Sequence, residues 1–413
     1  MTSPPLEEPD EARRVLAALV RESGRDVLAT LVRVTGDLAL AEDAVQDASV
    51  RALETWARDG VPENPVAWLR LTARRRAIDL IRREAARHPK EAAAMSLGPP
   101  PDLPDDEPSA SVVEDDLLRL VFTCCHPSLA PATQVALSLR TLCGLTTAEV
   151  ARALLVSEAS MAKRLTRARQ KIAQAHIPYR VPPDHELPER WAAVLTTTYL
   201  LFNEGYAATE GPALVRDDLV EQAERLARLL VRLQPDDAGA IGLLALMLLQ
   251  DSRRATRVGP DGVALLLADQ DRGRWDEAKI DEGVRLVGEG LRRTPDRPDR
   301  YVVQAAIAAC HALAPSAEQT DWAAVVSWYD VLLRLDPGPV VRLNRAAAVA
   351  ERDGAAAGLA EVDAIDELAA YPWWHATRAV LLRRLARDEE AAAADALAES
   401  LPLNDPQRRL LAR

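Results

Sequence analysis

Residues 145–172 constrain the fold most, because they carry the signals of two helices joined by a tight turn: LTTAEVARALLVSEASMAKRLTRARQKI. Thr146 followed by Glu149 is a capping box, which predicts that a helix begins at Thr147. Ser157 is a favourable N-cap for a second helix. Glu158 lies in its first turn, where the helix dipole stabilises an acid. The stretch therefore predicts a helix-turn-helix.

The second of these helices has two faces of different chemistry. Apolar residues recur at helical spacing and predict a buried face: Met161, Leu165, Ala168 and Ile172. A basic outer face is typical of a recognition helix that enters the major groove of DNA. The alternative is an ordinary helical hairpin with a solvated basic face. The candidate DNA-contacting residues are Ser157, Ser160, Lys163, Arg164, Arg167 and Lys171.

Composition favours an all-α protein. Aromatic residues make up only 4 % of the 413 residues, and no long stretch alternates with the period of a strand. The length predicts two to four domains. The first ten residues lack the apolar core of a signal peptide, and the longest apolar run, 241–249, is too short to span a bilayer. We therefore expect a soluble, cytoplasmic protein with no membrane contact.

The formal net charge of −12 by itself argues against a nucleic-acid partner, but the charges are unevenly distributed along the chain. Residues 70–90 are strongly basic, as is the helix-turn-helix, while the acidic surplus lies in residues 91–116 and in the C-terminal half. The asymmetry of charge along the chain is thus more informative than its sum.

Four helices are expected before the basic segment ends, at 11–22, 25–35, 38–58 and 65–87. Asp37 is a candidate N-cap for the third helix. Asn64, followed by Pro65 at the first helical position, is a candidate N-cap for the fourth. The outer face of the third helix is polar and mostly acidic. Trp56 and Trp68 occur among apolar residues at helical spacing, which favours core packing over stacking on bases.

Three blocks in this order resemble the two conserved domains of sigma-70 family factors of the extracytoplasmic-function (ECF) group. They are GDLALAEDAVQDASVRALETW, NPVAWLRLTARRRAIDLIRRE and the helix-turn-helix. The resemblance covers residues 10–175. It implies a promoter-specificity subunit, not an enzyme, whose partners are core RNA polymerase and promoter DNA. No cofactor and no metal are expected.

The resemblance also assigns roles to residues. It implies that Asp43, Gln46 and Asp47 bind the core polymerase, where acids complement basic partner residues. The recognition helix would contact the −35 element. Arginines at the −10 element would hold phosphates beside an unstacked base. The residues implied at −10 are Asn64, Arg74, Arg75, Arg76, Arg82 and Arg83.

The expected domains follow from these matches: 1–90, sigma domain 2; 91–112, an acidic, Pro-rich linker; 113–176, sigma domain 4; 177–188, a connector; and 189–413, a helical regulatory domain. In sigma domain 4, helices are expected at 113–123 and 131–142 before the helix-turn-helix. Cys124, Cys125, His126 and Cys143 invite a zinc site, but adjacent cysteines rarely both bind one ion, so buried thiols are the favoured interpretation.

The C-terminal half predicts a tetratricopeptide-like solenoid. Several of its helices end near a proline, and helix pairs that close on proline near a 34-residue unit resemble tetratricopeptide repeats. The period is irregular, and no unit carries the full signature of the repeat. The expected helices are 189–201, 217–233, 238–250, 276–293, 300–313, 321–335, 340–351, 355–368, 373–386 and 388–399. Such a domain offers a concave surface to a protein or peptide regulator. One ECF subgroup carries an extension of this kind, which is thought to control its activity.

Several polar residues among small apolar ones leave two interpretations open. They either line a groove or form buried pairs that tie helices together: Asn203, Glu204, Asp269, Asp271, Arg272, Asn344 and Arg345. At the level of function, the alternative to a sigma factor is a helix-turn-helix regulator that binds duplex DNA without core polymerase. An enzyme is disfavoured, since the C-terminal histidines are far apart in sequence and no catalytic motif accompanies them.

Overall fold

The computed structural model describes residues 8–87, 110–154, 156–175, 177, 179–208 and 213–412. These residues form helices and no strand, apart from a single bridge between Val258 and Ala264. The prediction of an all-α protein is confirmed. The chain divides into two compact units, residues 1–197 and 198–413. No helix in the described ranges is both long and apolar enough to span a bilayer.

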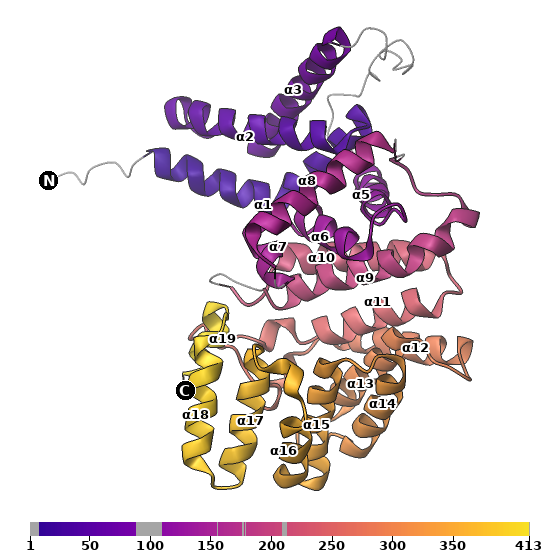
Figure 1. Ribbon diagram of the computed structural model, residues 1–413, viewed down its shortest axis with the longest axis vertical. Coiled ribbons are helices and arrows are strands. Elements are labelled where there is room, and N and C mark those ends of the chain that lie inside the picture. The colour runs from indigo at the N-terminus through magenta and orange to yellow at the C-terminus, as the bar shows by residue number, and fades with distance from the viewer. Residues whose placement is uncertain are drawn as a thin grey trace, which may run out of the picture. The chain divides into compact units, whose positions relative to one another are not determined.

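The first unit is a cluster of helices in which α1 packs against α2, α3 and α5, and α8 packs against α6 and α7 (Figure 1). Its helices are α1 (Glu8–Thr35), α2 (Leu38–Asp59), α3 (Pro65–Arg87), α5 (Ala110–Cys124), α6 (Pro131–Thr141), α7 (Thr147–Ala153), α8 (Glu158–Gln174) and the start of α9 (Leu187–Tyr206). Most of the predicted linker 91–112 lies outside the described residues, and α5 begins at its end.

The two helices expected at 11–22 and 25–35 are one continuous helix, α1, so this prediction was wrong. Gly24 lies in its interior, where glycine costs roughly 1 kcal/mol relative to alanine. Apolar side chains on both sides of Gly24, among them Leu19 and Val27, are buried. Continuous burial of this face outweighs the local preference of a single glycine.

The predicted caps are present. The Asp37 Oδ1 atom accepts a hydrogen bond from the Ala39 amide at 2.7 Å. Asn64 Oδ1 likewise accepts from the Ala67 amide at 3.0 Å. The capping box before α7 is reciprocal: the Thr146 amide donates to Glu149 Oε2 at 2.5 Å, and the Glu149 amide donates to Thr146 Oγ1 at 3.2 Å.

The second unit is a helical array in which each helix packs on its neighbour in the chain, as in a helical solenoid. Its helices are the end of α9, α10 (Asp217–Leu233), α11 (Ala238–Asp251), α12 (Glu277–Arg293), α13 (Arg300–Leu313), α14 (Trp322–Leu335), α15 (Pro339–Asp353), α16 (Ala355–Asp363), α17 (Pro372–Arg384), α18 (Asp388–Ser400) and α19 (Asp405–Leu411). Short 3-10 turns separate some of them, namely η2 (Arg254–Thr256), η3 (Leu267–Asp269), η4 (Arg272–Arg274) and η5 (Asp366–Leu368).

Three details differ from the sequence prediction. The helix expected at 189–201 continues to Tyr206. The helix expected at 355–368 ends at Asp363 and is followed by η5. The third difference is α19, which sequence reasoning missed. A capping box precedes α19, in which Asn404 Oδ1 accepts from the Gln407 amide at 3.0 Å. The sequence Asn-Asp-Pro-Gln carries that signal.

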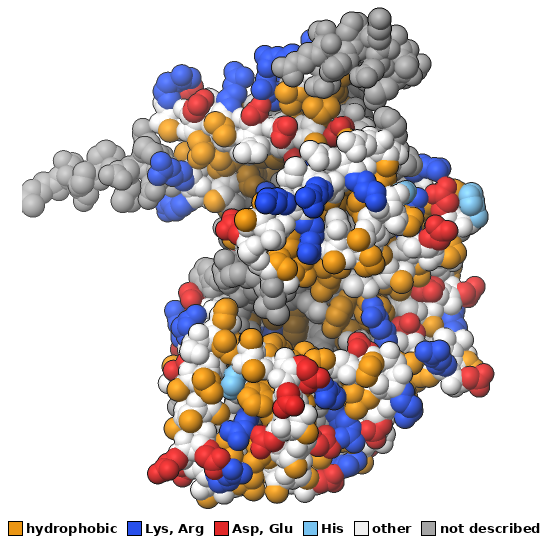
Figure 2. Space-filling model, viewed as in Figure 1, with side chains coloured by type: hydrophobic (Ala, Val, Ile, Leu, Met, Phe, Trp, Pro, Cys, Tyr) orange, Lys and Arg blue, Asp and Glu red, His pale blue; other side chains and the backbone are white. Residues whose placement is uncertain are grey.

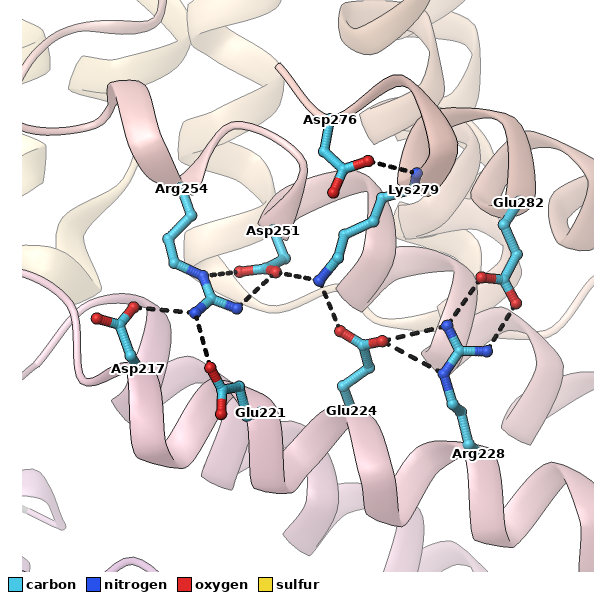
Figure 3. A network of polar contacts seen from close by, with 9 residues as sticks. All are labelled: Asp217, Glu221, Glu224, Arg228, Asp251, Arg254, Asp276, Lys279 and Glu282. Atoms are coloured by element: carbon cyan, nitrogen blue, oxygen red, sulfur yellow. Dashed lines mark hydrogen bonds and ion pairs between the residues drawn. The ribbon is translucent and has the colours of Figure 1, made fainter. Parts of the chain in front are cut away.

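A network of ion pairs joins α10, α11, η2 and α12 (Figure 3). Asp251, whose side chain is 3 % exposed, accepts from Arg254 at 2.6 Å and from Lys279 at 2.6 Å. Lys279 also reaches Glu224 at 2.8 Å. Arg228 bridges Glu224 and Glu282. Each carboxylate therefore faces a cation, and the network connects elements that the sequence separates.

For two of the scattered polar residues, Arg345 and Arg272, the contacts favour the role of tying segments together. Arg345 donates to Asp330 at 2.7 Å and to Glu361 at 2.6 Å, so it ties α14, α15 and α16 together. Arg272 also holds two segments together, as described below. Asp269, Asp271 and Asn344, in contrast, are exposed.

Candidate nucleic-acid interface

Helix α8 separates an apolar inner face from a basic outer face. Ser157 caps the helix, and its Oγ atom accepts from the Ser160 amide at 3.3 Å. The predicted inner face is buried, with Met161, Leu165, Ala168 and Ile172 each at most 7 % exposed. The outer residues Ser160, Lys163, Arg167 and Lys171 are exposed, and Arg164 is half-buried.

The basic side chains of α8 share one hollow with the start of α6. Its volume is about 470 Å³, and the residues that line it are Leu129, Ala130, Thr133, Ser160, Lys163, Arg164, Arg167, Ala168 and Lys171. Figure 2 shows blue Lys and Arg side chains gathered over α8. Four cations on one concave surface favour a polyanion such as the DNA backbone. Sequence reasoning missed Leu129, Ala130 and Thr133, because they precede the helix-turn-helix.

The second predicted DNA surface lies on α3 and the loop before it. Arg75, Arg82 and Arg83 are exposed, whereas Arg74 and Arg76 are half-buried. Asn64 is exposed, but its Oδ1 atom is engaged as the N-cap of α3. Trp56 is buried, and its ring meets that of Trp68 edge-on at a centroid distance of 5.4 Å. The prediction of core packing is confirmed for Trp56.

The predicted polymerase-binding residues lie on the outer face of α2. Asp43, Gln46 and Asp47 are exposed there. Asp47 Oδ2 accepts from Arg76 Nε at 2.5 Å, so a residue predicted to bind polymerase is paired with one predicted to bind DNA. The sequence assigned these two residues to separate surfaces.

The same face of α2 continues into apolar side chains that sequence reasoning did not include. Val50 is 50 % exposed and Leu53 is 38 % exposed. Val50 lies seven residues after Asp43, a spacing that places both on one side of the helix. Contiguous exposed apolar side chains are typical of an interaction surface, so Val50 and Leu53 are candidates for one. The heptad spacing could have identified Val50.

Contacts within the first unit join the two predicted sigma domains. Asp116 of α5 is fully buried and accepts from Arg33 of α1 at 2.9 Å and from Arg119 at 2.9 Å. Tyr179 Oη lies 2.9 Å from the Ala29 carbonyl oxygen and 2.6 Å from the Asp116 carbonyl oxygen. Burial raises the pKa of Asp116, while the two guanidinium groups oppose that shift. Arg169 of α8 also pairs with Glu42 of α2 at 2.5 Å.

The cysteines near α5 are packed as small apolar residues. Cys124, Cys125 and Cys143 are buried, and Cys125 Sγ lies 3.3 Å from Thr197 Oγ1. Burial raises the pKa of both adjacent thiols, that of Cys125 to about 11, so they are not thiolates at neutral pH. Within the described ranges, no three His, Cys, Asp or Glu side chains gather as a metal site.

Matches to known sequence families identify the family to which the chain belongs. Residues 19–87 match the family described as Sigma-70 region 2, and residues 119–172 match Sigma-70, region 4. The first match spans α2 and α3, and the second spans α6, α7 and α8. The chain belongs to the sigma-70 family. It is a factor of the ECF type with a C-terminal extension, and residues 190–291 of that extension match a family of unknown function, DUF6596.

Relatives of this sigma-70 family member are of two kinds. An uncharacterized protein of Rhizobium meliloti is 44 % identical over 371 residues, which cover 89 % of this chain and 87 % of that protein. The probable ECF RNA polymerase sigma factor SigI of Mycobacterium tuberculosis is 32 % identical over 153 residues, or 36 % of this chain and 51 % of SigI. No solved structure matches the chain.

Proposed function

We propose that this sigma factor binds core RNA polymerase through the outer face of α2 and contacts promoter DNA through α8 and α3. Family membership supports core polymerase and promoter DNA as partners. The observation that carries the DNA assignment is the hollow on α8, which collects four basic side chains on one exposed surface. In this proposal α8 contacts the −35 element.

The second DNA surface is α3 with Asn64, which would contact the −10 element. Arg75, Arg82 and Arg83 are exposed on α3 and would bind phosphates. Arg76 is paired with Asp47, and the Asn64 Oδ1 atom caps α3, which leaves the Asn64 side-chain amide to contact DNA. Arginine suits phosphate because its planar group donates two parallel hydrogen bonds.

The polymerase-binding surface comprises Asp43, Gln46, Asp47, Val50 and Leu53. The acidic residues would orient the encounter, and the exposed aliphatic side chains would supply the apolar contact that charges at a rim do not. The second compact unit would regulate this activity by binding a protein or peptide on its helical array.

Substitution of the α2 face tests the polymerase assignment. We expect the double variant Asp43→Arg, Gln46→Arg to lose co-purification with core polymerase at least tenfold, because it places two cations where basic partner residues are expected. Asp47 is left intact, so its ion pair with Arg76 persists. The matched control is Glu399→Arg, an exposed acid on α18.

Transcription in vitro with core polymerase then reports function directly. The wild-type chain and the control should both redirect initiation to a cognate promoter, whereas the α2 variant should not. Undiminished core binding by the α2 variant would refute this surface. Tight, specific duplex binding by the chain alone, with no effect of core polymerase, would favour the helix-turn-helix regulator instead.

A further inference from the structure

Three arginines meet around the segment that links α11 to α12 in the second unit. The Arg257 guanidinium carbon lies 3.5 Å from the centroid of the Tyr206 ring, and that of Arg253 lies 5.6 Å from the same centroid. The segment is tied at its ends, since the Asp276 amide donates to the Ser252 carbonyl at 2.8 Å. Arg253 and Arg257 are therefore held on one aromatic side chain.

Arg272 approaches the same place from η4. Its Nη1 atom donates to the carbonyl oxygens of His311, at 2.5 Å, and Ala314, at 2.9 Å. Its guanidinium carbon lies 4.6 Å from the centroid of the Trp275 ring. Trp275 Nε1 in turn donates to Thr256 Oγ1 at 3.0 Å, which joins η4 to η2. Arg272 is thus fixed at the C-terminal end of α13.

None of these three arginines forms an ion pair with a carboxylate among the described residues. Arg253 donates to the Gln250 side chain, Arg257 donates to the Tyr206 carbonyl, and Arg272 donates to carbonyls. The neighbouring network in Figure 3 is the opposite case, because each of its cations faces at least one acid. The contrast is notable because half-buried cations are ordinarily paired.

Burial and neighbouring cations disfavour the charged forms of this cluster more than nearby acids favour them. Burial lowers the pKa of Arg272, the charge of Arg253 lowers it further, and the carboxylate of Glu318 acts in the opposite direction. Burial also lowers the pKa of Arg257, where the carboxylate of Asp251 acts in the opposite direction. Burial also lowers the pKa of His311, to about 4, with added contributions from Arg253 and Arg272. His311 is therefore neutral at pH 7, while the three arginines keep their charges.

Three of these side chains carry unused polar atoms. Arg272 Nη2, His311 Nδ1 and Tyr206 Oη are buried and have no hydrogen-bond partner in the part of the chain that the structure describes. The residues that carry them are only half-buried, so solvent reaches part of each side chain. Two features thus coincide among the described residues: three guanidinium groups that form no ion pair with a carboxylate, and buried polar atoms without a hydrogen-bond partner.

We propose that Arg253, Arg257 and Arg272, together with His311 and Tyr206, form a binding site for an oxyanion, the phosphate or carboxylate group of a small ligand. An oxyanion would pair directly with the guanidinium groups and would accept hydrogen bonds from the unused donors. Guanidinium groups bind both anions in the same planar geometry. The site lies wholly within the second unit, so it is distinct from the surfaces that would contact DNA.

Thermal unfolding of the full-length chain tests this site with two probes, inorganic phosphate and succinate, at constant ionic strength set with chloride. A probe at tenfold its Kd should raise the Tm at which the second unit unfolds by about 3 °C. Arg253→Gln should weaken that binding about tenfold or more, because one charged donor is lost. The matched control Arg274→Gln removes an exposed arginine of η4 and should bind like the wild type.

The proposal also predicts the Tm of a variant in the absence of any probe. Arg253→Glu places a carboxylate among the remaining arginines, so its Tm in phosphate-free buffer should equal or exceed that of the wild type, and the probe effect should disappear. Stabilisation by phosphate alone would assign a phosphate-bearing ligand, and stabilisation by succinate a carboxylate. The proposal is overturned if neither probe raises the Tm, if Arg253→Gln responds like the wild type, or if only Arg167→Gln in α8 abolishes the response.

Discussion

The carboxylate of Asp251 joins three elements of the second unit, because it pairs with cations from two other elements. Its side chain is 3 % exposed, and burial by itself would disfavour its charged form. Hydrogen bonds from Arg254 and Lys279 outweigh this effect and lower the pKa of Asp251 below its ordinary value of 3.8. The charge is kept because two elements outside α11, η2 and α12, each supply a cation.

Removal of this carboxylate should therefore destabilise the chain. We expect Asp251→Asn to lower the free energy of unfolding by about 3 kcal/mol, since it leaves two partly buried cations without their shared partner. Asp217→Asn is the control. Asp217 pairs with Arg254 too, but its side chain is 68 % exposed, so a change below about 1 kcal/mol is expected. Urea denaturation of the two variants and the wild type measures both values, and equal losses would contradict the role of burial.

The direction of the Asp251 pKa shift determines how the stability difference between the wild type and Asp251→Asn depends on pH. Because the folded pKa of Asp251 is lowered, its contribution to stability is present above pH 3.8 and is lost as the pH falls through the lower, folded value. The stability difference between wild type and Asp251→Asn should be constant from pH 8 to about pH 5 and shrink only in stronger acid.

At the scale of one element, α8 does two tasks with opposite faces. Its inner face is packed against α6 and α7, and its outer face lines the basic hollow. The Ser157 cap sets where the helix begins, which fixes the side of the helix on which the basic residues fall. Arg169 forms an ion pair with Glu42 of α2 and does not line the hollow, so not every cation of α8 contributes to the basic surface.

Substitution of the outer face should change the salt dependence of promoter binding. In complex with core polymerase, Arg164→Gln with Arg167→Gln should weaken binding to the promoter and reduce the slope of log K against log salt by about 2, because each guanidinium that is removed would otherwise neutralise one phosphate. Arg180→Gln, an exposed arginine of the connector, is the control. An unchanged slope in the double variant would mean that α8 does not bind phosphates.

At the scale of the whole molecule, the boundary between the compact units falls inside a helix. The first unit ends at Thr197 and the second begins at Thr198, both within α9. Leu187 and Val194 of α9 are buried, and Thr197 contacts both Cys125 and Ser138. A cut in the predicted connector 177–188 would remove these residues from the first unit.

Two fragments test this division. Residues 1–197 should unfold cooperatively, whereas residues 1–183 should have a Tm lower by several degrees, because the core around Cys125 no longer includes the side chains from α9. Circular dichroism melts measure the difference, and equal Tm values would show that α9 contributes nothing to the first unit. Transcription by the fragment 1–197, compared with the full chain, also tests whether the second unit regulates activity.

The local sequence determined most helices and their starts. Caps such as Asp37, Asn64 and Ser157 act on amides two or three residues away, and the buried face of α8 repeats with the helical period. These signals act within one or two turns, so they can be predicted without the fold. Only tertiary structure decided that α1 continues through Gly24, that Arg76 pairs with Asp47, and that Arg253, Arg257 and Arg272 meet around Tyr206 and His311. Each of these depends on packing between segments distant in sequence, whose energies outweigh local preference and leave no periodic pattern in the chain.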